Sequence, residues 1–261
     1  MTELVHSHID GGILTLTLDS PANRNALGEQ LVGELLDGLR SAEKDAAVRA
    51  VVLTHTGRTF CAGADLSEAL SKGRSVEEAS AVGTQSMIDL MRTILELPKP
   101  VIAKVDGHVR AGGFGLIGAC DIALAGPDST FALTESRLGL APSVISLVLL
   151  PKMTARASGR YFITGETFDA ATAVGLGVIS EAAESAADLD GLLERLLGGV
   201  RKASPQGLAA SKVLTTNAIL AEFSAHAAER AEQSANLFGS DEAREGMSAF
   251  LQKRPPTWDL T

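Results

Sequence analysis

Cysteine, positive charge and long apolar runs are all scarce in this sequence, and each shortage excludes something. The only cysteines are Cys61 and Cys120, too few for a disulfide scaffold and in keeping with a reducing compartment. The formal net charge is -9, whereas nucleic acid and anionic membranes attract basic patches. We therefore expect no nucleic-acid partner, no membrane association and a cytoplasmic location.

Membrane, secretion and metal signals are also missing. The longest apolar run, residues 144–150, is far shorter than the roughly 18 residues of a membrane-spanning helix. The opening MTELVHSHIDGG has neither the basic nor the apolar region of a secretory signal. The histidines are scattered without metal-ligand spacing, so we expect no metal site. They are His6, His8, His55, His108 and His226.

What is present is an alternation of strand-like and helix-like segments. Residues 4–9 and 13–18 are predicted strands joined by a turn, and further strands are predicted at 49–54, 101–105, 121–125 and 130–133. Asn25 is predicted to cap a helix with apolar residues at helical spacing from 27 to 39. Ser75 and Glu78 form a capping box for a helix that reaches residue 97.

Later segments are predicted to be mostly helical. Helices are expected at 153–162, at 169–175 with Asp169 as cap, and at 188–202. Two helical blocks follow, one up to about 217 and one from about 221, with a break at 239–240 where Ser240 can cap a new helix. We therefore predict an α/β protein with a core at 1–200 and a helical region at 201–261 that packs against another subunit.

Residues 99–121, KPVIAKVDGHVRAGGFGLIGACD, form the segment around which the chain is expected to be organised. A predicted strand leads into a glycine corner and a short apolar helix, whose first N–H groups favour negative charge. GFGLIG matches the dinucleotide pattern G-x-G-x-x-G, but residues 106–112 separate it from the strand, which argues against a nicotinamide site. Close packing is the plainer reason for such glycines.

A second loop of small residues, FCAGADL at 60–66, follows another predicted strand. Its backbone can approach a ligand without obstruction by side chains. Two such loops on neighbouring parallel strands can direct two backbone N–H groups at one oxygen. The pair of loops therefore predicts an oxyanion hole made by the backbone.

Four motifs resemble those of the crotonase superfamily, the enoyl-CoA hydratase/isomerase family, and they follow one another along the chain in the order typical of that family. FCAGADL resembles F-x-A-G-A-D-[LI], and 107–113 resembles G-x-x-x-G-G-G with Ala111 in place of a glycine. PANRNAL at 21–27 resembles P-x-x-x-N-A-L, and Phe131, Glu135 and Gly139 match the second acidic segment. The resemblance implies the crotonase (ClpP-like) spiral of β-β-α units, a helical C-terminal oligomerisation region, and a trimer or a dimer of trimers.

The resemblance also implies roles for individual residues. Ala64 and Gly112 would hold the thioester oxygen, and Glu135 would be the catalytic acid/base, its pKa raised by apolar neighbours. The residues expected to bind the acyl-CoA are Arg24, Ala62, Asp65, Leu66, Phe250 and Lys253. Asp65 is also explained as a loop anchor, and Phe250 and Lys253, expected to reach an adjacent subunit, as helix packing and a solvated lysine. No cofactor is implied beyond the CoA of the substrate.

One departure bears on the reaction. Gly115 stands where two-glutamate hydratases of the family carry their other acid, so either one carboxylate suffices or another group positions the water. RLGLAPSVIS at 137–146 resembles the bacterial branch that hydrates methylglutaconyl-type enoyl-CoAs. Within this segment, Ser143 is expected to line the pocket or anchor water. Arg110, just before the glycine corner, is either a partner for a distal acyl carboxylate or a surface residue.

These features together predict an enoyl-CoA hydratase that adds water to a 2-enoyl-CoA, branched ones included. The alternatives are a Δ3,Δ2-enoyl-CoA isomerase that uses a single glutamate and a non-catalytic acyl-CoA binder. A serine hydrolase is disfavoured because the sequence has no G-x-S-x-G elbow.

Overall fold

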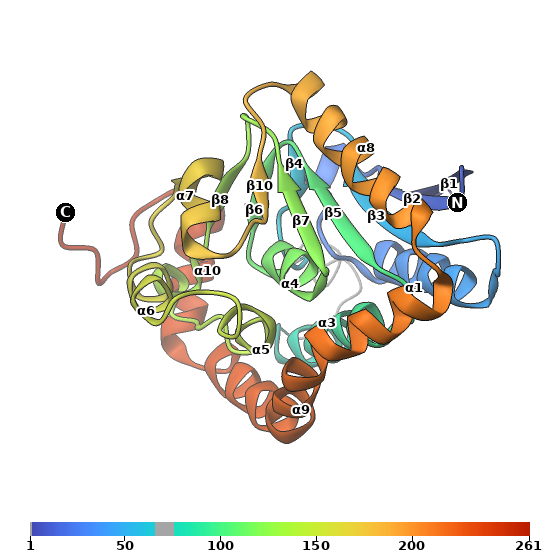
Figure 1. Ribbon diagram of the computed structural model, residues 1–261. Coiled ribbons are helices and arrows are strands. Elements are labelled where there is room, and N and C mark those ends of the chain that lie inside the picture. The colour runs from blue at the N-terminus through green and yellow to red at the C-terminus, as the bar shows by residue number, and fades with distance from the viewer. Residues whose placement is uncertain (1, 66–75) are drawn as a thin grey trace.

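The structure is a computed structural model that describes residues 2–65 and 76–261, and it contains two β-sheets enclosed by helices (Figure 1). Leu66 and Ser75, both of which carry sequence predictions, lie outside the described residues. The larger sheet has six strands. In spatial order these are β1 (Val5–Asp10), β2 (Ile13–Leu18), β3 (Ala50–His55), β5 (Val101–Val105), β7 (Ile122–Ala125) and β10 (Glu181–Ala182). Only the β1–β2 hairpin is antiparallel.

The smaller sheet contains β4 (Thr59–Cys61), β6 (His108–Arg110), β8 (Thr130–Ala132) and β9 (Phe168–Asp169), in that order. The first three strands run parallel, and each follows a strand of the large sheet after a short turn. Chain order is thus β3-β4-helix, β5-β6-helix and β7-β8-helix, the expected spiral of β-β-α units. Of the strands with two or three residues, the sequence predicted only β8; β4, β6, β9 and β10 were not predicted, because so few residues show no periodicity.

The helices are α1 (Glu29–Lys44), α3 (Val76–Glu96), α4 (Gly112–Ala119), α5 (Ser146–Leu149), α6 (Ala155–Thr164), α7 (Ala170–Leu176), α8 (Ala186–Lys202), α9 (Pro205–Phe238) and α10 (Asp241–Leu251), with 3-10 turns η1 (Pro21–Asn23) and η2 (Glu135–Leu138). Asp169 and Ser240 are the predicted N-caps of α7 and α10, and each side chain accepts a backbone N–H.

The prediction of two helical blocks after residue 205 is wrong. α9 is one helix of 34 residues, because nothing between 217 and 221 breaks it and its buried Phe223 joins the main core.

The prediction that Asn25 caps α1 is also wrong. α1 begins at Glu29 after Gly28, while Asn25 is fully buried with a positive φ of 53°. The Asn25 side chain accepts the N–H of Ser20 and donates to the carbonyls of Thr56 and Thr59. Asn25 therefore fastens the segment before α1 to the turn between β3 and β4, which leads into the predicted site.

Helix α4 lies at the centre of the molecule, enclosed by the sheets and by α3 and α5 (Figure 1). Its Phe114 is fully buried and packs edge-on against Phe131 of β8, with ring centroids 6.0 Å apart. Phe131 in turn stacks on Phe168 of β9 at 5.6 Å. This aromatic cluster holds the first turn of α4 against the small sheet.

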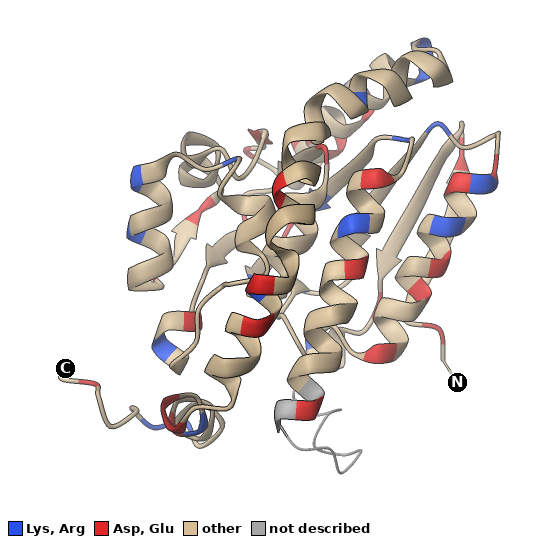
Figure 2. Cartoon of the chain, turned by 90° about the horizontal axis from the view of Figure 1, so that it is seen from below, with Lys and Arg blue, Asp and Glu red and all other residues tan. Residues whose placement is uncertain are grey.

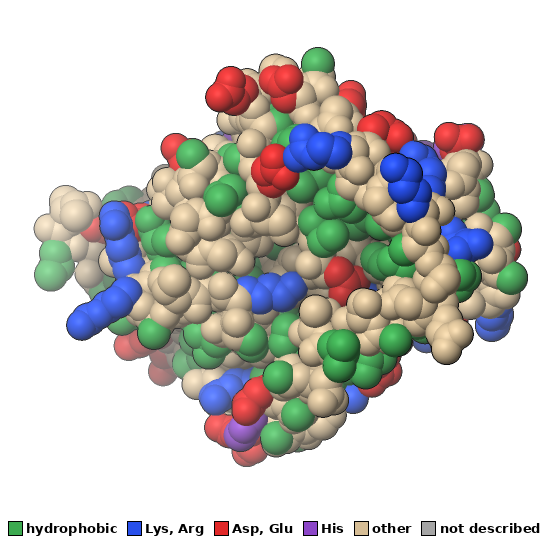
Figure 3. All heavy atoms as spheres, viewed as in Figure 1, with side chains coloured by type: hydrophobic (Ala, Val, Ile, Leu, Met, Phe, Trp, Pro, Cys, Tyr) green, Lys and Arg blue, Asp and Glu red, His purple; other side chains and the backbone are tan. Residues whose placement is uncertain are grey.

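Charged side chains of both signs are interspersed along the outer helices (Figure 2), and hydrophobic side chains are visible among them on the face in Figure 3. On α9, Val213 and Leu214 are 61% and 83% exposed. Within the described residues, no helix is long and apolar enough to cross a membrane. Whether 201–261 forms a subunit contact, and whether the chain is a trimer, stay predictions.

Candidate active site

Three of the predicted residues lie just beyond the C-terminal ends of adjacent parallel strands. Ala64 follows β4, Gly112 follows β6 and Glu135 follows β8, and these strands are neighbours in the small sheet. Adjacent strands are about 4.8 Å apart, so the three groups share one edge of the sheet. The carboxyl end of parallel strands is also where open α/β sheets bind ligands.

The loop that carries Ala64 is held by backbone hydrogen bonds to the segment before α1. The Leu27 N–H donates to the Gly63 carbonyl at 2.7 Å, and the Ala62 N–H donates to the Arg24 carbonyl at 3.1 Å. Leu27 and Ala64 form a parallel bridge. The hydrogen bonds of this bridge join Leu27 to Gly63 and Asp65, the residues on either side of Ala64. The Ala64 N–H therefore points away from Leu27 and has no hydrogen-bond partner among the described residues, and Ala64 as a residue is exposed.

The glycine corner lies against this loop. Gly112 is the first residue of α4, so its N–H has no carbonyl one turn earlier in the helix. A Cβ on Gly63 would lie 2.7 Å from the Cβ of Ala111 and 3.4 Å from the Gly112 nitrogen. Only glycine at position 63 allows this approach, and its φ of +95° also suits glycine. The two loops thus bring Ala64 and Gly112 together.

Ala111 holds the corner in a strained conformation. Its φ of 43° and ψ of -119° are unusual for a residue with a side chain. The resemblance places a glycine at this position, which would adopt the same angles without strain. Such a conformation costs of order 1–3 kcal/mol, and here it turns the chain from β6 into α4.

Glu135 begins η2, and its carboxyl group is removed from water although the residue as a whole is partly exposed. Burial raises the pKa of Glu135 to about 7, against a small opposing effect of a hydrogen bond from its own N–H. Its Oε2 atom is buried and lacks a hydrogen-bond partner among the described residues. The predicted rise in pKa is confirmed, and the carboxyl can bind or release a proton near neutral pH.

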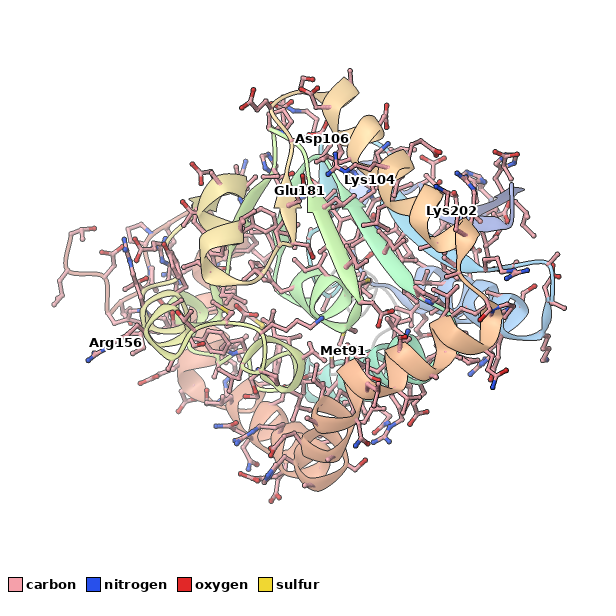
Figure 4. All side chains as sticks on the ribbon, in the orientation of Figure 1. Met91, Lys104, Asp106, Arg156, Glu181 and Lys202 are labelled. Atoms are coloured by element: carbon pink, nitrogen blue, oxygen red, sulfur yellow. The ribbon has the colours of Figure 1, made fainter. Side chains whose placement is uncertain are left out.

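The space beside Gly115 is filled by other side chains. A Cβ at Gly115 would meet the Met87 methyl group, and would lie 2.9 Å from Ile145 and 3.0 Å from Met91. Met91, labelled in Figure 4, lies on α3 below α4 and is fully buried. Sequence analysis identified the missing acid but not Met87 or Ile145, because these come from other elements.

Other groups near the site can be assigned or excluded. The Cys61 thiol is fully buried, which raises its pKa to about 12, so it is no nucleophile at neutral pH. The Arg110 guanidinium donates to the carbonyls of Val109 and Thr130 and to the Thr130 hydroxyl. Arg110 therefore joins β6 to β8, which leaves its alternative role toward an acyl carboxylate without support. No cluster of potential metal ligands occurs in the described part of the chain.

The remaining predicted binding residues are spread over three places. Asp65 accepts a hydrogen bond from the Asn23 amide at 2.9 Å, beside Ala62 and Ala64. Arg24, in the left-handed region with a φ of 61°, lines a surface hollow of about 550 Å³ together with Arg58 and His108, two residues that sequence analysis missed. Phe250 and Lys253 are exposed at the C-terminal end of α10. Ser143 is 5% exposed.

Comparisons with known proteins show which family the chain belongs to. The family model for enoyl-CoA hydratase/isomerase matches residues 8–260. A solved structure of a putative enoyl-CoA hydratase from Mycobacterium avium paratuberculosis K-10 is 56% identical, with a TM-score of 0.91 over 98% of this chain and 99% of that one. Probable enoyl-CoA hydratase from Bacillus subtilis is 32% identical over 95% of both chains, and 1,2-epoxyphenylacetyl-CoA isomerase from Escherichia coli is 32% identical over 98% of both.

The match covers nearly the whole chain, and the fold is the crotonase fold that these relatives share. The methylglutaconyl-type branch is not specifically supported by these relatives. The chain is an enzyme of the enoyl-CoA hydratase/isomerase family.

Proposed function

We propose that this enzyme adds water reversibly to a 2-enoyl-CoA thioester, with the enolate oxygen held by the N–H groups of Ala64 and Gly112 and the proton carried by Glu135. The observation that carries the proposal is the position of these three groups just beyond the C-terminal ends of the neighbouring strands β4, β6 and β8. The names of the relatives agree, since most contain enoyl-CoA hydratase.

The two N–H groups act on charge that develops during the reaction. When oxygen attacks Cβ of the enoyl group, electrons move onto the thioester oxygen and an enolate forms. Donors already fixed at that position favour the transition state over the substrate, and one such donor is worth roughly 3–4 kcal/mol. The N-terminus of α4 adds partial positive charge beside Gly112.

A single carboxyl can account for both proton transfers. The Glu135 carboxylate accepts a proton from water as the water oxygen bonds to Cβ. The same carboxyl then gives that proton to Cα, the enolate collapses to the thioester, and the carboxylate is regenerated. A pKa of about 7 suits this alternation, because neither protonation state is strongly favoured at neutral pH.

A second candidate is the isomerisation of a 3-enoyl-CoA to a 2-enoyl-CoA. The observation that favours it is the apolar surface of Met87 and Ile145 over Gly115, where a water-activating acid would otherwise be. Glu135 would then take a proton from Cα, which forms a dienolate held by the same N–H groups, and return that proton to the γ-carbon. This reaction needs no water, so the two candidates differ in product.

The hollow that contains Arg24 and Arg58 supports binding of the CoA phosphates, because it brings two guanidinium groups together in a chain of net charge -9. The absence of any further cofactor, the cytoplasmic location and the roles of Leu66, Phe250 and Lys253 stay predictions.

Glu135→Gln tests the proposal. The amide keeps the size of the side chain but cannot exchange the proton, so we expect turnover to fall by about 10³-fold while acyl-CoA binding is kept. Absorbance assays with crotonyl-CoA and 3-methylglutaconyl-CoA measure hydration, and a 3-enoyl-CoA assay measures isomerisation. Glu184→Gln, a change to an exposed glutamate, is the control. Turnover of wild-type size in Glu135→Gln would remove Glu135 from the mechanism.

A further inference from the structure

Helix α10 packs against the 3-10 turn η2 through backbone contacts that leave no space. A Cβ on Gly246 of α10 would lie 2.5 Å from the carbonyl oxygen of Leu138 and 2.7 Å from its Cα. On the other side of the contact, a Cβ on Gly139 would lie 2.7 Å from the carbonyl carbon of Glu242. Backbone atoms cannot turn aside as a long side chain can, so this contact fixes the distance between α10 and η2.

The contact is connected directly to Glu135. The N–H groups of Gly139 and Leu140 both donate to the Glu135 carbonyl. On its opposite side, η2 is held by α6, because Arg137 Nε donates to the Thr164 carbonyl at 3.0 Å and the Ser136 hydroxyl to the Ile163 carbonyl at 3.0 Å. Because the Glu135 carbonyl is hydrogen-bonded to the residues that follow Leu138, and α6 holds the other side of η2, we expect a displacement at Leu138 to be passed on to Glu135.

We propose that Gly246 is a positioning residue: by letting α10 lie directly on η2, it sets the place of Glu135 and keeps water from its carboxyl group. The inference rests on the proposed function of Glu135. It gives the C-terminal region a role within its own subunit, separate from the predicted subunit contact.

The charged groups on the elements around η2 do not explain the state of Glu135. On α10 and the tail after it, Glu245 pairs with Arg254, and Arg244 pairs with Asp241. Beside α6, Arg160 pairs with Glu166. Arg137 donates to a carbonyl, and Glu242 is exposed. Burial is the main cause of the raised pKa of Glu135, so a looser contact should lower that pKa as water enters.

The test compares Gly246→Ala with Gly198→Ala. Gly198 lies within α8, and a Cβ there would meet nothing within 4 Å, so the same change is made without a contact. We expect Gly246→Ala to lower kcat for hydration about tenfold, to leave KM within about twofold, and to move the inflection of the kcat/KM profile, which reports the free enzyme, from about pH 7 toward lower pH. Gly198→Ala should match the wild type in all three. Circular dichroism and thermal unfolding establish that each full-length variant is folded.

A second variant keeps the test decisive if Gly246→Ala does not fold. Ser240→Ala removes the side chain that caps α10 by accepting the Ala243 N–H, and Ser185→Ala removes the equivalent cap of α8. We expect only Ser240→Ala, of these two variants, to lower the pH of the kcat/KM inflection. An unchanged inflection in folded Gly246→Ala, or in Ser240→Ala, would overturn the positioning role. Glu135→Gln is measured in parallel, and if that variant keeps its turnover, it is the proposed function that fails.

Discussion

At the scale of single residues, the buried carboxyl of Glu135 links catalysis to stability. In the folded protein its pKa is raised to about 7 from an ordinary value of 4.5. The folded state therefore holds this proton more tightly than the unfolded state. The stability that this tighter binding contributes is fully present below pH 4.5 and is lost as the pH rises through about 7. At 1.36 kcal/mol per pKa unit, the loss amounts to about 3 kcal/mol.

Glu135→Gln should therefore stabilise the protein at high pH and not at low pH, because the amide is never charged. The measurement is urea unfolding of the wild type and the variant at pH 5 and at pH 8. We expect the difference in unfolding free energy to grow by about 2.5 kcal/mol between the two conditions, because pH 5 already lies slightly above the unfolded pKa of 4.5. Other titrating groups cancel in this difference, and Glu184→Gln should show no such trend. A difference independent of pH would mean that the carboxyl is hydrated.

Gly115 is fixed at the same scale by its neighbours. Gly115→Glu would place a side chain into Met87, Met91 and Ile145. We expect the free energy of unfolding to fall by about 3 kcal/mol, because of overpacking and burial of the carboxyl. Met87→Ala removes the flexible group nearest the new side chain. Combined with Gly115→Glu, it should recover at least about 1 kcal/mol relative to the sum of the single changes.

Urea unfolding of the four members of this double-mutant cycle measures that coupling energy. Met153 is also buried but is not among the atoms nearest Gly115, so a cycle with Met153→Ala should be additive. Additive behaviour in the Met87 cycle would show that Met87 does not occupy the place of the missing acid.

At the scale of elements, periodic segments were predictable, whereas of the strands with two or three residues only β8 was predicted. The alternation in ILTLTL predicted β2, and Asp169 and Ser240 predicted two helix starts, since an N-cap is a local signal. The strands β4 and β6 have three residues each, and only their pairing partners define them. Asn25 was misjudged because its side chain bonds to Thr56 and Thr59, more than 30 residues away.

In the candidate site too, residues in local motifs were predictable, and residues contributed by distant segments were not. Ala64, Gly112 and Glu135 stand in local motifs, so the resemblance of those motifs named them as candidates, and the apolar neighbours of Glu135 predicted the direction of its pKa shift. Met87 contacts the glycine corner from α3, and Gly246 contacts η2 from α10. Such contacts between distant segments leave no signal in either segment alone, and they decide how much room the reacting groups have.

At the scale of the whole molecule, one buried ion pair fastens the long helix α9 to the central sheet. Lys212 of α9 is 5% exposed, and its Nζ lies 2.9 Å from Asp121 Oδ2, just before β7. The same Nζ donates to the carbonyls of Ile94 and Lys99 at 2.7 and 3.1 Å. Asp121 also accepts the N–H of Val101 at 2.7 Å. The pair thus joins α9, the end of α3 and the first residues of β5 and β7.

Removing only the lysine should be more harmful than removing both charges. Lys212→Met leaves the Asp121 carboxylate buried without its ion-pair partner, which typically costs about 3–5 kcal/mol. Asp121→Asn in the same chain removes that charge and keeps an oxygen for the Val101 N–H, so the double variant should be more stable than Lys212→Met by at least about 1 kcal/mol. Urea unfolding at one fixed protein concentration measures both, with exposed Lys202→Met as the control. A double variant no more stable than Lys212→Met would show that helix packing, and not the paired charges, holds α9 in place.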